Sequence, residues 1–109
     1  MIKIITGDTA TFTFSITYPG AVDGIEAPDL SQANVVFAMQ KQGSTRVVIE
    51  KTIVHPQSNI VYFSITPEET SSLVAGPHNA CCKIYFDNGE AKTVWLGDIM
   101  VIKGLLNAR

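Results

Sequence analysis

Residues 11–18 alternate strictly between apolar or aromatic side chains and hydroxyl-bearing side chains, and this pattern constrains the fold more than any other feature. Phe12, Phe14, Ile16 and Tyr18 occupy the even positions, and a threonine or serine occupies every odd position. Because successive side chains of a β-strand point to opposite faces, a period of two predicts a strand with one buried face and one face in water. The β-branched and aromatic residues favour the same structure.

Further segments with strand signals follow at intervals of about ten residues, separated by turn residues. They cover residues 2–5, 34–40, 46–53, 60–65, 78–86, 91–96 and 98–102, and Gly97 is expected to separate the last two. The sequence Asp87-Asn88-Gly89 predicts a tight hairpin, because Asn-Gly accepts the positive φ angles that such turns require.

The period changes once, near residues 67–73, where the sequence predicts a short helical turn. Thr66 is a suitable N-cap, Pro67 fits the first helical position and Glu69 completes a capping box.

Many short strands in a chain of 109 residues predict a single all-β domain. We expect an immunoglobulin-like antiparallel β-sandwich of about seven to eight strands over residues 1–103, followed by a C-terminal tail over residues 104–109. In the strand 46–53, Val47, Ile49 and Ile53 are expected to face inward. The apolar phase of the other strands predicts a core made of Phe12, Phe14, Ile16, Val35, Phe37, Val61, Phe63, Ile65, Ile84 and Phe86.

The charge pattern argues against nucleic acid as a partner. The 8 basic and 10 acidic side chains are scattered, the net charge is −2, and no basic cluster could neutralise a row of phosphates. The N-terminal residues reach Asp8 before they form the apolar run of a signal peptide, and no segment approaches the roughly 20 apolar residues that span a bilayer. We therefore expect no signal peptide and no contact with a membrane.

The two cysteines, Cys81 and Cys82, are adjacent and are therefore expected to point to opposite faces of a strand. We predict two reduced thiols, one inward and one outward, with a vicinal redox pair as the alternative. His55 and His78 have no Cys, Asp or Glu at the spacing of a zinc site.

Other side chains that could carry chemistry do not form a motif. Asp23, Glu26 and Asp29 share a loop and could gather around calcium, but their spacing favours a solvated turn. Tyr85 and Trp95 flank the predicted hairpin and could form a sugar-binding platform, although strand spacing favours ordinary cross-strand packing. We therefore predict no enzymatic activity, no catalytic residue, no cofactor and no metal site.

A succession of motifs runs along about residues 5–102. It consists of Gly7-Asp8, Phe12-x-Phe14-x-Ile16, Leu30-x-x-Ala33-x-Val35-x-Phe37-x-Met39-x-Lys41, Val61-x-Phe63-x-Ile65, Glu69-Thr70-x-x-Leu73-x-x-Gly76 and Thr93-x-x-x-Gly97-Asp98-Ile99. This succession resembles the immunoglobulin-like N-terminal domain of phage baseplate upper proteins and related tail proteins. His78 stands where these domains commonly have an aromatic residue.

The resemblance implies a domain without an active site that attaches a fibre or receptor-binding part to the virion. We therefore expect a structural, protein–protein interaction module of a phage or prophage tail or baseplate, assembled in the host cytoplasm and located in the virion tail. Its expected partners are other tail proteins or further copies of itself. A carbohydrate-binding or adhesin-type sandwich is the alternative.

We expect the partner contacts at the two ends of the chain. Ile2, Ile4 and Ile5 begin at the terminus, where a strand is expected to lie at a sheet edge with unpaired backbone groups, and we assign Ile2 and Ile4 to the contact. Leu105 and Leu106 follow the last strand, where a solitary domain has little reason to hold two leucines in water.

Overall fold

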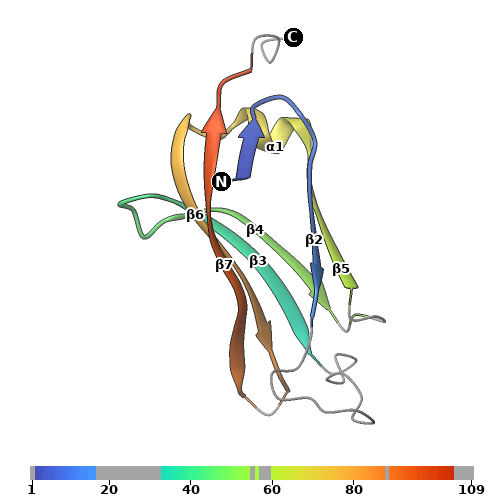
Figure 1. Cartoon of the computed structure of the whole chain (residues 1–109). Helices are drawn as coiled ribbons and strands as arrows, with labels where there is room; N and C mark the ends of the chain where they lie inside the picture. The colour runs from blue at the N-terminus through green and yellow to red at the C-terminus, as the bar shows by residue number, and fades with distance from the viewer. Residues whose placement is uncertain (1, 17–32, 55, 57–59, 88, 105–109) are drawn as a thin grey trace.

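The computed structural model describes residues 2–16, 33–54, 56, 60–87 and 89–104, and these form seven strands and one short helix (Figure 1). In chain order the elements are β1 (Ile2–Ile5), β2 (Ala10–Ser15), β3 (Asn34–Lys41), β4 (Val47–Val54), β5 (Ile60–Ile65), α1 (Pro67–Ser71), β6 (Gly76–Tyr85) and β7 (Ala91–Ile102). The predicted all-β sandwich with one helical turn is confirmed.

The strands form two sheets of unequal size. The larger sheet has the order β1-β7-β6-β3-β4, and the smaller one pairs β2 with β5. All pairs are antiparallel except β1 with β7, which run parallel. The prediction of an entirely antiparallel sandwich was wrong at this pair, because the last strand returns beside the first one in the same direction.

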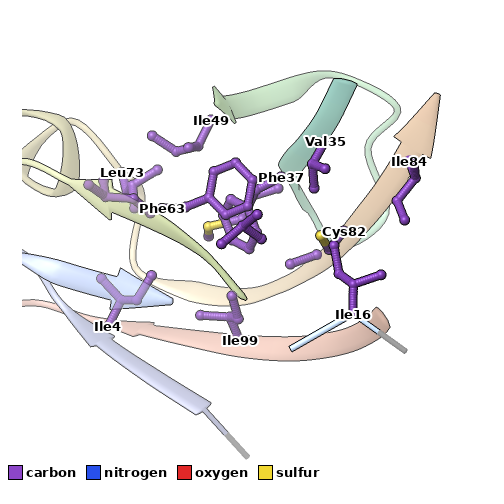
Figure 2. Packing of buried hydrophobic residues seen from close by; sticks show 14 of the residues in the cluster. Ile4, Ile16, Val35, Phe37, Ile49, Phe63, Leu73, Cys82, Ile84 and Ile99 are labelled. Atoms are coloured by element: carbon purple, nitrogen blue, oxygen red, sulfur yellow. The ribbon is translucent and has the colours of Figure 1, made fainter. Parts of the chain in front are cut away.

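Side chains from both sheets meet in one core, where Figure 2 shows Phe63 of β5 close to Phe37 of β3. The rings of Phe12 and Phe37 stack with their centroids 4.8 Å apart, and so join the small sheet to the large one. Of the ten predicted core residues, three are only half-buried at its margin: Phe12, Phe14 and Phe86. The other seven are buried: Ile16, Val35, Phe37, Val61, Phe63, Ile65 and Ile84.

Of the three side chains of the strand 46–53 that were expected to face inward, one does not. Ile49 is buried and Ile53 packs against the core, but Val47 is 43% exposed. The register between β3 and β4 shifts after Met39, so that Met39 pairs with Ile49 and Gln40 pairs with Val47. This bulge reverses the face on which the start of β4 places its side chains.

The helix α1 has the predicted N-terminus. The Glu69 N–H donates to Thr66 Oγ1 at 3.2 Å, and the Thr66 N–H donates to Glu69 Oε1 at 2.9 Å. Lys51 on β4 donates to both Glu69 carboxylate oxygens, at 2.7 and 2.6 Å. These hydrogen bonds, first the one from Lys51, lower the pKa of Glu69 and anchor α1 to the large sheet.

Thr70 connects α1 to the turn between β1 and β2. Its hydroxyl is completely buried, accepts the Gly7 N–H at 3.0 Å and donates to the Asp8 carbonyl at 2.8 Å. Gly7 has a φ of 90°, which disfavours any other residue. The turn that places β1 at the sheet edge is therefore fixed by a side chain more than sixty positions away in the chain.

The last two strands form the predicted hairpin. The Phe86 N–H donates to the Glu90 carbonyl at 2.8 Å, and Gly89 has a φ of 91°. The expected break at Gly97 was wrong, because β7 continues from Ala91 to Ile102.

Candidate partner interface

The first strand lies at the edge of the large sheet, as predicted. Figure 1 shows β1 beside β7, with both strands pointing the same way. Ile2 is 38% exposed and remains a candidate contact residue, but Ile4 is only 2% exposed and belongs to the core. The assignment of Ile4 to a partner interface was therefore wrong, because its side chain fills the sandwich beside its register partner Val101, which is also buried.

Two exposed isoleucines, Ile5 and Ile102, were not among the residues assigned to the interface, although Ile5 belongs to the strand that was expected to make the contact. Ile5 is 45% exposed and Ile102 is 39% exposed, and they are register partners in the parallel pair β1–β7. Residues paired in register share a face of the sheet, so these two form an apolar pair on the outer face. No local pattern predicts this pair, since its members are separated by nearly the whole chain.

The chain that follows β7 begins beside the same pair. The Gly104 N–H donates to Thr6 Oγ1 at 2.8 Å, and the Thr6 N–H donates to the Ile102 carbonyl at 2.9 Å. A Cβ at position 104 would collide with the Thr6 carbonyl oxygen, so this close approach requires glycine. Leu105 and Leu106 lie outside the described residues, but the last described residue before them is fixed next to β1.

A shallow groove of about 200 Å³ runs along β1 and the start of β2. Its apolar lining comes from Ile2, Ile4, Ile5, Ala10 and Phe12, and Lys3 and Asp8 add opposite charges. We define the apolar edge as Ile2 and Ile5 on β1 together with Ile102 on β7.

The structure does not bring Tyr85 and Trp95 together as a sugar-binding platform. Tyr85 is 45% exposed, whereas Trp95 packs against the core, with its ring 5.4 Å from that of Phe14. The two aromatic side chains therefore point to opposite faces of the large sheet. Trp95 packs in the core between the two sheets, which differs from the expected cross-strand packing.

The cysteines have the predicted arrangement. Both are free thiols, with Cys82 buried and Cys81 partly exposed on the other face. Burial, and secondarily the proximity of Cys81, raises the pKa of the Cys82 thiol to about 12. A thiol that stays protonated at neutral pH is a poor nucleophile, so Cys82 does not supply an activated thiolate.

Within the described ranges, no group of three or more His, Cys, Asp or Glu side chains is arranged to hold a metal ion. His78 is buried on β6, whereas His55 and the candidate calcium ligands Asp23, Glu26 and Asp29 lie outside those ranges.

In the part of the chain that the structure describes, no helix is long and apolar enough to cross a membrane.

Comparison with known protein families finds no family that matches the chain, and comparison with curated protein sequences finds no match either.

Proposed function

We propose that the protein is a structural interaction module of a phage or prophage tail or baseplate, and that it joins other tail proteins, or further copies of itself, through the apolar edge. The observation that carries the proposal is the exposed apolar pair of Ile5 on β1 and Ile102 on β7, which lies beside the start of the C-terminal segment. Ile2 adds exposed apolar surface at the start of the same four-residue edge strand. The assignment to a tail rests on the resemblance of the motif succession. The module is assembled in the host cytoplasm and resides in the virion.

The edge strand β1 is the part of the molecule best placed to bind a partner. Natural proteins seldom leave an edge with exposed apolar side chains uncovered, because its free backbone groups can pair with another strand. Burial of a whole isoleucine side chain stabilises by about 1.5–3 kcal/mol, so burying the exposed parts of these three would contribute roughly 1 kcal/mol each before ordering costs. A single contact is then weak, but many copies in one assembly strengthen each other.

The alternative, a carbohydrate-binding or adhesin-type domain, depended on outward-facing aromatic side chains. Because Trp95 is directed into the core, the pair that suggested this function is not formed. No other observation favours it.

The test combines an interaction assay with a matched control. Ile5→Ser with Ile102→Ser removes apolar surface from the apolar edge, and Val54→Ser removes it from β4, where Val54 is 62% exposed at the opposite edge of the same sheet. We expect the double variant to weaken self-association in sedimentation, or binding to purified tail proteins encoded by neighbouring genes, while Val54→Ser does neither.

Two results would contradict the proposal. One is wild-type protein that stays monomeric and binds none of those tail proteins. The other is a neighbourhood of genes for polysaccharide-degrading enzymes together with absence of the protein from purified virions.

A further inference from the structure

A second hollow, of about 490 Å³, lies between the β3–β4 hairpin and the segment after α1, and none of the residues of the apolar edge lines it. Lys41, Ser44 and Arg46 form its rim on the hairpin side, and Ser72 and Val74 form the opposite rim. Its volume falls in the range of sites for small ligands. We refer to this hollow as the hairpin pocket.

The hairpin rim is held in place by its own hydrogen bonds. The Ser44 N–H donates to the Lys41 carbonyl at 3.0 Å, and the Arg46 N–H donates to Ser44 Oγ at 3.1 Å. The Gln42 N–H donates to the Pro77 carbonyl on β6 at 3.1 Å, which ties the hairpin to the neighbouring strand. The cationic side chains therefore start from a fixed backbone, which lowers the ordering cost of binding.

The charge of the hairpin pocket is one-sided. Lys41 and Arg46 both line it, and none of the described residues that line it is an acid. The ion pair found among the described residues joins Lys51 to Glu69 and leaves both rim cations without a carboxylate. Two such cations in a partly enclosed site favour an anion, and the guanidinium fork of arginine fits a carboxylate.

The hairpin pocket also offers one unused polar atom. His78 is only 1% exposed, and its Nδ1 donates to the Gly76 carbonyl at 3.0 Å, because a carbonyl oxygen can only accept. Within the described part of the chain, no hydrogen bond reaches Nε2, the other nitrogen of a ring that lines the pocket. In the neutral ring with the proton on Nδ1, Nε2 is an acceptor and suits an N–H donor.

The remaining lining is apolar. Leu73 is 7% exposed, while Val48 and Val74 are 39% and 59% exposed. The pocket thus presents three matching features to a ligand: cations for a carboxylate, an acceptor for an N–H and an apolar surface for a side chain.

We propose that the hairpin pocket binds the C-terminal residue of a polypeptide whose last side chain is apolar. That residue carries the three required groups on one small unit: a carboxylate, a backbone N–H and an apolar side chain. The site is separate from the apolar edge, and the inference does not rest on the assignment to a phage tail.

The experiment uses the full chain labelled with ¹⁵N and follows the backbone amides of Ser44, Arg46 and Val74 by NMR. N-acetyl-leucine and a pentapeptide ending in leucine are expected to shift these three amides. N-acetyl-leucinamide lacks the negative charge and 4-methylpentanoate lacks the N–H. Each should therefore bind at least about tenfold more weakly than N-acetyl-leucine.

Variants separate the cations of the pocket from charge in general. Lys41→Gln and Arg46→Gln are each expected to weaken binding of N-acetyl-leucine about tenfold. Lys92→Gln removes one positive charge near the start of β7, which does not line the pocket, and should leave the affinity unchanged. Since Lys41 and Arg46 are both exposed, their replacement should not prevent folding.

The proposal is overturned if N-acetyl-leucine at about 10 mM shifts none of the three amides. It is equally overturned if the leucinamide or inorganic phosphate binds as well as N-acetyl-leucine does, or if Arg46→Gln has no effect. Binding of N-acetyl-leucine without binding of the pentapeptide would show that the pocket takes a free acid and would exclude a chain terminus.

Discussion

The Trp95 indole lies directly over Gly97, so closely that a Cβ at position 97 would be 2.9 Å from Cη2 of the ring. The same indole lies 6.5 Å from the ring of Phe37 in the middle of the core. Glycine at position 97 therefore gives the indole the room to reach the core from β7.

Replacement of Gly97 by alanine is expected to displace the indole and to destabilise the protein by about 1–3 kcal/mol, as overpacked cores do. The chain has one tryptophan, so its fluorescence emission reports the change directly and should shift to longer wavelength. Denaturant unfolding of Gly97→Ala, Trp95→Leu and the double variant measures the coupling. We expect Gly97→Ala to cost at least 0.5 kcal/mol less, in rough terms, in the Trp95→Leu background. Strictly additive costs would contradict the contact.

The hydroxyl of Thr70 is expected to stabilise the turn between β1 and β2. Thr70→Val keeps the shape of the side chain but leaves the Gly7 N–H and the Asp8 carbonyl without their partner. We expect a loss of about 1–3 kcal/mol in the free energy of unfolding and faster hydrogen exchange at the Gly7 amide. Thr70→Ser, which keeps the hydroxyl, is the control, and an unchanged Gly7 exchange rate in Thr70→Val would count against the interpretation.

The two central phenylalanines are expected to differ in their contribution to stability. Phe37 is completely buried, so Phe37→Ala should cost about 3–5 kcal/mol. Phe14 is half-buried at the margin of the core, and Phe14→Ala should cost clearly less. Urea unfolding measures both, with Tyr62→Ala as the control, because Tyr62 is 63% exposed. Equal costs for the two phenylalanine variants would show that the centre of the core is misplaced.

The buried thiol predicts a dependence of stability on alkaline pH. The pKa of Cys82 rises from 9.0 to about 12 in the folded protein. Between these values the folded state holds a proton that the unfolded state has lost, so the free energy of unfolding should fall as the pH rises through this window. The slope contributed by Cys82 is at most about 1.4 kcal/mol per pH unit.

Unfolding curves from about pH 8, just below this window, to about pH 11, inside it, test this thiol. Cys82→Ala should lack that part of the slope, whereas Cys81→Ala should retain most of it, since burial is the main cause of the shift. Identical slopes in the two variants would rule out Cys82 as its source.

Short stretches of the sequence determined much of the fold. The alternation after Thr11 placed Phe12 and Phe14 on the face toward the core, and the residues around Thr66 and Gly89 predicted the helix start and the last hairpin correctly. Each of these features depends on side-chain direction or backbone conformation over a few residues, which local sequence specifies.

Only the tertiary structure decided which end residues face outward and where a pocket forms. Ile4 is buried and Ile5 is exposed because the core covers the face of the β1–β7 pair that carries Ile4 and Val101, and the partner of Ile5 lies 97 positions later in the chain, at Ile102. The hairpin pocket likewise joins side chains from two separate segments, residues 41–48 and 72–74, around His78. A local pattern with a period of two shows that neighbouring side chains point in opposite directions. Which direction is inward is decided by the element that packs against the strand, and that contact joins residues far apart in the sequence.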